Sequence, residues 1–496
     1  MALSAGIQPL LSRMAGRKAL VVGDAMLDTY HRGTTERLCP EAPVPVVAVK
    51  ERVDAPGGAG NTAVNMRALG AHVTLLGAVG DDGEGRTLRR VLENAGVPSS
   101  AVLVEPGRRT LAKQRVVAGS QMIVRFDQGS TGRLAPACEA EIARRLGILA
   151  AESDAIIVSD YGYGVLGPRV LEALAAAQQR SPRVVVVDSR TLGAYRAVGP
   201  TAVKPNFREA TRLLGELVAG GAERSRLIAQ HGRALLQITG AQIVAVTLDT
   251  EGAVFFEKDR ETYRTYARPV DPSRAAGAGD TFAAALALAL AAGADMPAAA
   301  EIASAASAVV VAKHGTATCS LAELGAYLAG GEKVATDLGA FSGALEGHRR
   351  ESRRIVMTSG CFDILHRGHI AYLNAAKALG DVLVIGLNSD ASVRRRKGPE
   401  RPINTLEDRA HVLASLSCVD HIVAFEEDTP ERLVAAIRPL LFVKGGDYTA
   451  EELPEARVVE AYGGAVRILP FVEDRSTTSI IERIRAAARP PARRSA

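Results

Sequence analysis

Residues 354–380, RIVMTSGCFDILHRGHIAYLNAAKALG, place the tightest limit on how this chain can fold. The apolar run at 354–359 predicts a buried strand, residues 360–367 a turn, and residues 368–379 a helix. His366 and His369 therefore lie where a strand passes into a helix. That edge of a parallel α/β sheet binds phosphate groups, because the N–H groups that open the helix have no partner within it.

The spacing of the two histidines suits phosphate chemistry. Gly368 lets a ligand approach the backbone, and two imidazoles on one helical face can donate hydrogen bonds to charge developing between two phosphates. For this tetrapeptide alone, two histidines that cap a helix remain an alternative. Further motifs occur at predicted element boundaries: RRRKG (394–398), EDR (407–409), VKGGDY (443–448) and STTSII (476–481).

With these motifs, residues 354–487 resemble nucleotidyltransferases of the cytidylyltransferase superfamily, which implies a Rossmann-like α/β domain. By this resemblance His366 and His369 are catalytic and contact a triphosphate, and Lys397 binds phosphate charge. The resemblance also implies a second phosphate-binding helix start, formed by Ser476, Thr477 and Thr478.

Length and composition limit the remaining possibilities. A chain of 496 residues predicts two or three domains, and its formal charge of +5 does not require a nucleic-acid partner. The five cysteines lack CxxC spacing, which argues against zinc and a disulfide framework and favours the cytoplasm. The N-terminus has no signal-peptide pattern, and the longest apolar run, residues 281–292, is too short to span a bilayer.

The first half of the chain has its own α/β pattern. From residue 154, strand-like and helix-like segments alternate, which predicts a doubly wound parallel sheet. An earlier strand, residues 18–23, ends in GDAMLD, and prolines then exclude helix in PEAPVPV. The strand-like segments at 73–79, 112–117 and 122–126 predict a small sheet or lid beside the main sheet.

Gly277, Ala278, Gly279 and Asp280 stand at the start of a long apolar helix. Small residues leave successive N–H groups free to bind an anion, and the helix dipole favours negative charge there. A carboxylate in this turn would repel phosphate, so it fits a general base that takes a proton from an attacking hydroxyl. An aspartate N-cap is the alternative for this motif alone.

Together with GDAMLD, three further motifs make residues 15–320 resemble sugar kinases of the ribokinase (carbohydrate kinase B) family: GGAGNTAVN (57–65), KPNFRE (204–209) and KHGTAT (313–318). The resemblance implies that Asp280 is the catalytic base and that Gly277, Ala278 and Gly279 form the anion hole. It assigns magnesium and phosphate binding to Asn206 and Glu209. It assigns the sugar hydroxyls to Asp28, Gly58 and Asn61.

Two basic residues and one departure complete the kinase interpretation. Lys113 and Arg115, on strand-like segments, are candidates to bind a phosphate already on the substrate, or are solvated charges at a sheet edge. Arg274, Ala275 and Ala276 stand where the family has Asp-x-Thr/Ser. Because those oxygens suit a hard cation, their loss predicts a kinase step that runs without potassium.

The sequence thus predicts a kinase domain at 1–330, a linker at 331–353 and a nucleotidyltransferase domain at 354–496. This combination is similar to the bifunctional enzymes of ADP-heptose synthesis for the lipopolysaccharide core. The resemblance implies ATP in both steps, Mg²⁺, and a separate phosphatase acting between phosphorylation of heptose 7-phosphate and adenylyl transfer to heptose 1-phosphate. It also implies a homodimer with no nucleic-acid or membrane partner. The sequence indicates no residue as a dedicated metal ligand.

Two alternatives remain open at this stage. Another sugar or polyol kinase fused to a cytidylyltransferase would carry the same motifs. A regulatory kinase-like domain beside an active nucleotidyltransferase is the other alternative, because of the changed loop at Arg274.

Overall fold

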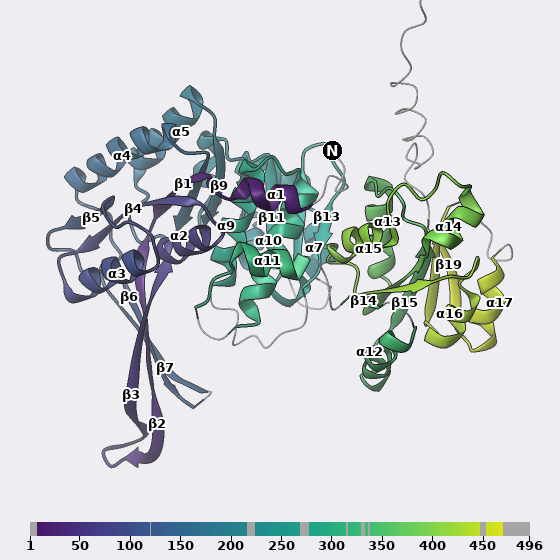
Figure 1. Ribbon diagram of the computed structural model, residues 1–496. Helices are drawn as coiled ribbons and strands as arrows, with labels where there is room; N and C mark the ends of the chain where they lie inside the picture. Colours follow the sequence, from purple (N-terminus) through teal and green to yellow (C-terminus); the bar gives the residue numbers. More distant parts are fainter. Residues whose placement is uncertain are drawn as a thin grey trace, which may run out of the picture. The chain divides into compact units, whose positions relative to one another are not determined.

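The computed structural model describes residues 7–119, 121–215, 224–267, 277–313, 316–328, 333–335, 338–446 and 453–469. Residues 10–324 form one compact unit, called the N-terminal unit, and the described residues from 325 onward form the C-terminal unit. Each unit is built on its own largely parallel sheet with helices around it, which confirms the predicted fold class (Figure 1). Among the described helices, none combines the length and hydropathy needed to cross a membrane.

The N-terminal unit contains a nine-stranded sheet that is parallel except at one edge, where β12 is antiparallel to both β11 and β13. In sheet order its strands are β13 (Tyr263–Thr265), β12 (Ala253–Glu257), β11 (Ile243–Thr247), β10 (Ala202–Val203), β9 (Val184–Ser189), β8 (Ala155–Asp160), β1 (Lys18–Gly23), β4 (His72–Gly80) and β5 (Val102–Glu105). The chain runs outward from β1 in one direction and from β8 in the other. Ligand sites of such sheets lie at this reversal, beyond the carboxyl ends of the strands.

Helices cover both faces of this sheet. One face carries α2 (Ala59–Ala68), α9 (Ala278–Ala291) and α10 (Met296–Val311), and the other carries α4 (Pro136–Ala151), α5 (Pro168–Arg180) and α8 (Gly232–Thr239). Leu20 and Val22 of β1 point into the core shared with α4 and α5, as the two-residue period of a strand requires. The remaining helices are α1 (Ile7–Met14), α3 (Gly83–Asn94), α6 (Phe207–Leu213), α7 (Arg224–Ala229) and α11 (Leu321–Leu328).

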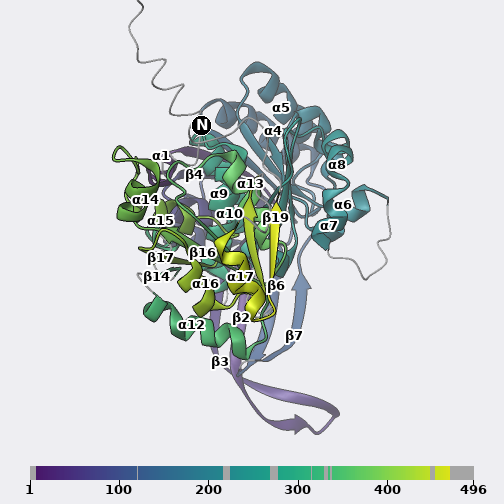
Figure 2. The same ribbon diagram turned by 90° about the vertical axis from the view of Figure 1, so that its right-hand side faces the viewer.

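The predicted small sheet is present and has four strands, but segment 73–79, which was expected in it, lies in β4 of the main sheet. Their order is β3 (Ala42–Gly58), β2 (Ala25–Cys39), β6 (Ala112–Ala118) and β7 (Gln121–Gln128). The long strands β2 and β3 run out from the body of the N-terminal unit, with β6 and β7 alongside them (Figure 2). This sheet brings Asp28 of β2 next to Lys113 of β6 in register.

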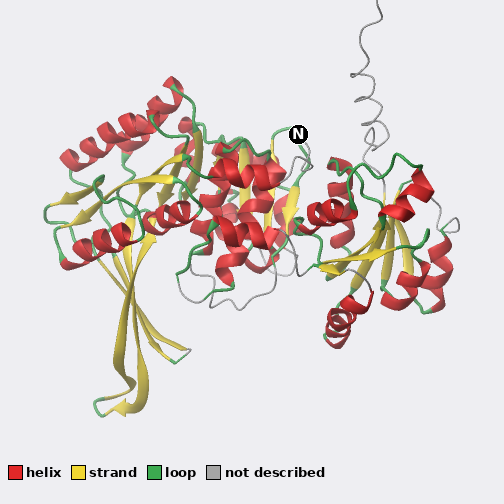
Figure 3. Ribbon diagram, viewed as in Figure 1, coloured by secondary structure: helices red, strands yellow, loops and turns green. Residues whose placement is uncertain are grey.

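The C-terminal unit contains a six-stranded sheet in which every strand pair is parallel. Its order is β14 (Val334–Ala335), β17 (His421–Phe425), β16 (Val382–Asn388), β15 (Ile355–Gly360), β18 (Leu441–Gly445) and β19 (Ala465–Leu469). Among the described residues, six helices lie around it (Figure 3). They are α12 (Leu338–Arg350), α13 (Arg367–Lys377), α14 (Asp390–Lys397), α15 (Leu406–Ala414), α16 (Glu431–Ile437) and α17 (Pro454–Ala461).

The segment 331–353, expected to be a linker, differs from that prediction. Val334 pairs with Ile422 in the sheet of the C-terminal unit. Phe341 and Leu345 of α12 are buried in the core of this unit. The two side chains are four residues apart and therefore share one helical face, an apolar stripe that the many glycines and charges around it obscured. The C-terminal unit thus begins before residue 334 rather than at 354.

Candidate active sites

A cavity of about 270 Å³ lies beyond the carboxyl ends of β8 and β9, on the ligand edge of the N-terminal sheet. It brings together five residues that the sequence singled out: Asn206, Glu209, Gly277, Gly279 and Asp280. It also contains six that sequence reasoning did not select: Asp160, Tyr161, Asp188, Ser189, Arg190 and Lys204. The predicted kinase motifs therefore converge on one cavity although they are distant in sequence.

Asp280 is held in this cavity by donors from two other elements. Its side chain is buried and accepts hydrogen bonds from Asn61 Nδ2 (2.7 Å), the Tyr161 hydroxyl (2.9 Å) and Thr62 Oγ1 (3.4 Å). Gly277 occupies the N-cap of α9, and no side chain caps this helix, so the N-cap alternative for Asp280 is wrong. Burial raises the pKa of Asp280 despite the hydrogen bonds from Asn61 and Tyr161. A carboxylate with a raised pKa is a stronger base.

The backbone at Gly277 should tolerate no side chain. Its φ is +84°, and an added Cβ would lie 2.7 Å from Asn61 Nδ2, the group that holds Asp280. We expect Gly277→Ala to slow sugar phosphorylation about tenfold or more, because moving Asn61 displaces the carboxylate. Gly293→Ala is the control: φ is +85° there, but no atom lies within 4 Å of the added Cβ. Equal kinase rates in the two variants would contradict this prediction.

Asp188 and Lys204 form a buried pair in the same cavity, with Nζ and Oδ2 3.1 Å apart. Burial, together with the nearby carboxylates of Asp280 and Glu209 and against the effect of Lys204, raises the pKa of Asp188 to about 6. Burial lowers the pKa of Lys204, but Asp188 and Glu209 outweigh that effect and the net shift is upward. The carboxylates of Asp188, Asp280 and Glu209 thus all act on one ammonium group, which leaves an excess of negative charge in this part of the cavity.

Asn206 and Glu209 form a capping box at the start of α6. Asn206 Oδ1 accepts from the Glu209 N–H at 2.9 Å, and Glu209 Oε2 accepts from the Asn206 N–H at 2.9 Å. These reciprocal bonds fix the motif on the cavity wall. The Asn-x-x-Glu spacing therefore has a structural function in this fold besides any role in binding magnesium.

The predicted substrate residues lie on the four-stranded sheet and the start of α2. Arg115 Nη1 donates to Asp28 Oδ1 at 2.8 Å, so these two candidates pair with each other. Lys113 Nζ lies 5.1 Å from the centroid of the Tyr161 ring, and burial lowers the pKa of Lys113. Both basic side chains are partly buried, so they are not solvated charges at a sheet edge.

Gly58 is the N-cap of α2, with φ +56°, and an added Cβ would lie 2.5 Å from the Asp24 carbonyl oxygen. Asp24 itself is fully buried and accepts from the N–H groups of Tyr161, Tyr163 and Val165 at 3.0–3.2 Å. Burial raises its pKa although these bonds lower it. Asp24 thereby holds the loop that carries Tyr161 toward Asp280.

The missed residues share one sequence signal. Asp160 and Asp188 lie in the last two positions of parallel strands, and Tyr161 and Lys204 directly follow strands β8 and β10. Polar residues at the carboxyl ends of parallel strands meet at one edge of the sheet, so the predicted strand ends could have identified these residues as part of the site.

In the C-terminal unit, His366 and His369 lie next to each other at the start of α13. Their ring centroids are 3.9 Å apart, and Phe362 packs against His369 at 5.4 Å. His366 occupies the N-cap position, but its side chain makes no capping hydrogen bond, so the helix-capping alternative is wrong for it. Burial, followed by the charge of His366, lowers the pKa of His369 to about 3. His369 is therefore a neutral hydrogen-bond donor near pH 7.

This low pKa predicts acid sensitivity. A histidine in the unfolded chain has a pKa near 6.5 and takes up a proton as the pH falls below that value. Folded His369 stays unprotonated down to about pH 3, so acid favours the unfolded state. Between pH 7 and pH 5 we expect His369 to lower the free energy of unfolding of the C-terminal unit by about 2 kcal/mol. Urea unfolding at both pH values measures this change. His369→Asn should show a smaller loss, and an equal loss would contradict the assignment.

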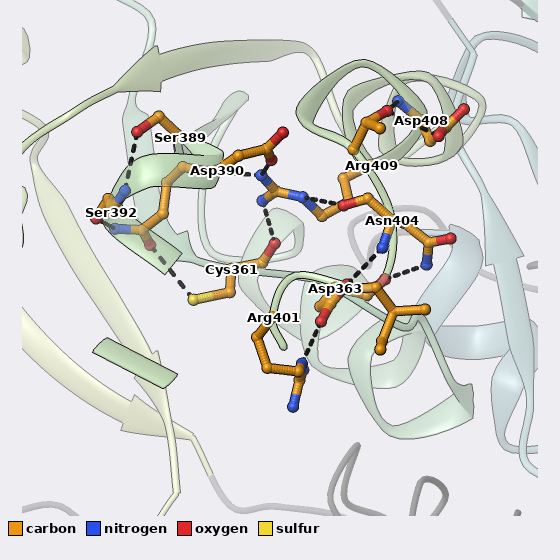
Figure 4. A network of polar contacts seen from close by, with 12 residues as sticks. Cys361, Asp363, Ser389, Asp390, Ser392, Arg401, Asn404, Asp408 and Arg409 are labelled. Carbon is orange, nitrogen blue, oxygen red and sulfur yellow. Dashed lines mark hydrogen bonds and ion pairs between the residues drawn. The ribbon is translucent and has the colours of Figure 1, made fainter. Parts of the chain in front are cut away.

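A polar network joins the loops that follow β15 and β16 (Figure 4). The Arg409 guanidinium is fully buried and donates to the carbonyl oxygens of Cys361 (2.6 Å), Asn388 (2.9 Å) and Asn404 (3.2 Å), and it pairs with Asp390 at 2.7 Å. The EDR motif thus holds the backbone that leads to the histidines.

A second carboxylate in Figure 4 fixes the facing loop. Asp363 accepts from the N–H groups of Ile403 (2.8 Å) and Asn404 (2.9 Å) and from the Arg401 side chain. Asp363 stands three residues before His366, so this contact sets the path of the turn between strand and helix.

Removing the buried guanidinium should be costly. We expect Arg409→Ala to lower the free energy of unfolding by about 3 kcal/mol, because three carbonyl groups and one carboxylate lose their donor. Denaturant unfolding checks this value. Arg395→Ala is the control, since Arg395 makes an ion pair at the surface with Asp428 and should cost at most about 1 kcal/mol. Equal losses in the two variants would contradict the role of the network.

The other predicted residues of this unit are less well placed. Lys397 is exposed at the end of α14 and has no ion-pair partner among the described residues. By contrast, Lys444 of the VKGGDY motif is largely buried and donates to Ser359 O (3.1 Å) and Oγ (2.9 Å) at the end of β15. Ser476, Thr477 and Thr478 lie outside the described residues, as do Arg274, Ala275 and Ala276.

Comparison with known proteins identifies a family for each of the two units. The model of the pfkB family carbohydrate kinases matches residues 17–323, and the cytidylyltransferase-like model matches residues 357–483. Among solved structures, phosphofructokinase-2 from Escherichia coli in complex with potassium is 22% identical, with a TM-score of 0.50 over 62% of this chain and 97% of that one. This likeness supports the fold of the N-terminal unit.

Curated relatives match both units at once. The "Bifunctional protein HldE" of Trichlorobacter lovleyi is 40% identical over 484 residues, which cover 96% of this chain and 97% of the relative. The same-named proteins of Geobacter sulfurreducens and Caulobacter vibrioides are 40% and 39% identical, over 96% and 95% of this chain and 98% and 97% of theirs. This chain therefore belongs to the family of bifunctional HldE proteins, enzymes that join a pfkB-family carbohydrate kinase to a cytidylyltransferase-like nucleotidyltransferase.

Proposed function

We propose that this enzyme carries out two steps of ADP-heptose synthesis for the lipopolysaccharide core. The N-terminal unit transfers a phosphoryl group from ATP to the anomeric hydroxyl of heptose 7-phosphate, which gives the 1,7-bisphosphate. A separate phosphatase removes the 7-phosphate. The C-terminal unit then transfers the adenylyl group of a second ATP to heptose 1-phosphate and releases pyrophosphate.

The observation that carries this proposal is the buried Asp280, held by Asn61 and Tyr161 at the start of α9 in a cavity beside Lys204. A carboxylate placed there can accept the proton of the anomeric hydroxyl as that oxygen attacks the γ-phosphorus of ATP. The N–H groups of Gly277, Ala278 and Gly279 would stabilise the charge of the transferring group. Asp28, Gly58 and Asn61 would orient the sugar, and Lys113 and Arg115 would bind its 7-phosphate.

Mg²⁺ would bind in the kinase cavity together with ATP, where Asp188, Glu209 and Asn206 would offer oxygen atoms to it; the described residues contain no group of three or more acidic, histidine or cysteine side chains that could hold the ion alone. Bound there, it would neutralise phosphate charge on ATP. The protein residues would still orient the sugar, position the Asp280 carboxylate that accepts the proton, and bind the phosphate chain of ATP.

In the second step no protein base is needed, because the attacking oxygen of heptose 1-phosphate is already anionic near neutral pH. The imidazoles of His366 and His369 would donate hydrogen bonds to the triphosphate as negative charge moves to the leaving pyrophosphate. Lys397 and Ser476, Thr477 and Thr478 would bind further phosphate oxygens.

The four-stranded sheet supports a homodimer. It exposes six large apolar side chains that are each 44–65% accessible: Leu38, Val44, Val49, Met122, Val124 and Phe126. Apolar side chains gathered on one sheet mark a surface that another protein covers. Light scattering of Val124→Lys beside the unmodified protein tests this.

The five free thiols support a cytoplasmic location.

One incubation tests the whole scheme. The protein is supplied with ATP and heptose 7-phosphate, with and without a phosphatase, and the products are followed by phosphorus NMR. We expect the 1,7-bisphosphate alone without the phosphatase, and ADP-heptose with pyrophosphate when it is present. Turnover of CTP in place of ATP, or no phosphorylation of the heptose, would overturn the proposal.

A further inference from the structure

A second cavity, of about 380 Å³, lies in the C-terminal unit away from the histidines. Ile355 begins β15, Leu440 precedes β18 and Gly464 precedes β19, so the cavity is at the amino ends of these strands. His366 lies beyond the carboxyl end of β15. Because β15 has six residues and a strand rises about 3.3 Å per residue, its amino end at the cavity and its carboxyl end near the histidines are about 20 Å apart. This cavity is therefore separate from the nucleotidyl-transfer site.

The cavity is lined by four arginines, Arg349, Arg353, Arg354 and Arg438, and by no acidic residue of the described part of the chain. Arg353 and Arg354 form ion pairs with Glu351 (2.6 Å) and Asp381 (3.0 Å) beside the cavity. Arg349 and Arg438 have no carboxylate partner among the described residues. Arg349 instead donates to the carbonyl oxygens of Ala436 and Ile437, both at 3.1 Å, at the end of α16. The cavity therefore has an excess of positive charge.

Arg438 adopts a backbone conformation that favours glycine. It is the C-cap of α16, with φ +48° and ψ +58°, where a glycine would end the helix without strain. Its guanidinium lies over the Tyr462 ring, 5.2 Å from the centroid. A strained residue persists where its side chain has a function that glycine lacks.

Tyr462 adds a hydroxyl group to this cavity wall. The hydroxyl is buried and has no hydrogen-bond partner among the described residues. Burial raises the pKa of Tyr462 to about 12, so the group stays protonated near neutral pH. A buried hydroxyl without a partner is costly, and a ligand or water that accepts from it would remove that cost.

We propose that this cavity is a second anion-binding site that takes the phosphate group of a small phosphorylated molecule. A planar guanidinium can donate two parallel N–H bonds to two oxygens of one phosphate. A ligand would not have to displace a carboxylate from Arg349 or Arg438, because neither has an acidic partner among the described residues. The Tyr462 ring offers an apolar wall for the rest of the ligand, and the volume suits a sugar phosphate or a mononucleotide. Because the cavity is on the opposite edge of the sheet from the histidines, the bound molecule is not a reactant of the transfer step.

Calorimetric titration of the full chain tests the site, with AMP, glucose 1-phosphate and inorganic phosphate as probes. We expect one binding event that weakens at least tenfold in Arg438→Gln and in Arg349→Gln. The control is Arg432→Gln. Arg432 is on α16, the helix that Arg438 caps, and its side chain is 86% exposed and does not line the cavity. Rates of both reactions should be unchanged in all three variants at saturating substrate.

Arg438→Gly separates ligand binding from packing. Because glycine relieves the strain at φ +48°, we expect an unchanged or higher melting temperature together with the loss of this binding event. Equal probe affinity in the unmodified protein and the cavity variants would overturn the proposal. So would a lower melting temperature with unchanged binding, which would show that Arg438 serves only to pack on Tyr462.

Discussion

Replacing Asp280 with asparagine should lower the rate of sugar phosphorylation by about 10²- to 10⁴-fold, the usual loss when a general base is removed. The amide cannot accept the proton of the anomeric hydroxyl. It also places N–H groups where Asn61 and Tyr161 now donate to a carboxylate. The coupled formation of ADP from ATP and heptose 7-phosphate measures this rate.

Adenylyl transfer in the same protein is the internal control. With heptose 1-phosphate supplied directly, Asp280→Asn should release pyrophosphate at the unmodified rate, because the histidines belong to a different compact unit. Tyr161→Phe offers a milder comparison, since it removes one donor to Asp280 and keeps the base. Near-normal kinase turnover in Asp280→Asn would show that the base is another residue.

Replacing His369 with alanine should lower pyrophosphate release from ATP and heptose 1-phosphate by about 10²- to 10³-fold, the usual loss when one group that stabilises transition-state charge is removed. The ring packs at a tilt against that of His366, with centroids 3.9 Å apart, and against Phe362, so its loss also frees its neighbour to move. Kinase turnover should stay unchanged. A pyrophosphatase-coupled assay measures the first rate, and the ADP assay measures the second.

His411→Ala is the matched control for this prediction, because His411 is exposed on α15 of the same unit. It should leave both rates unchanged. If His369→Ala lost both activities, misfolding or one shared site would explain the result better than a role in nucleotidyl transfer. Circular dichroism of the variant distinguishes these two explanations.

Much of the architecture could be predicted from the sequence, because local signals specified it. The strand, turn and helix around His366 appear within a residue or two of the predicted bounds, as β15 and α13. An apolar run, a glycine-rich turn and an amphipathic segment each act over few residues, so they are visible in the sequence alone. Asp280 was found for the same reason, at the start of an apolar helix.

Other features depended on contacts between distant segments. The bond from Asn61 to Asp280 joins residues 219 positions apart, and the pair of Asp28 with Arg115 needs two strands in register. α12 was predicted as a linker because its apolar stripe becomes evident only against the core that covers it.

The sequence by itself determined that the chain has two α/β units, and it predicted a phosphate-binding turn at the start of a helix in each. Only the tertiary structure decided the protonation of these sites. The pKa of Asp188 near 6 and that of His369 near 3 both follow first from burial, and neighbouring charges then modify them. Burial and the distance between charges are properties of the folded chain, and a residue's position in the sequence specifies neither.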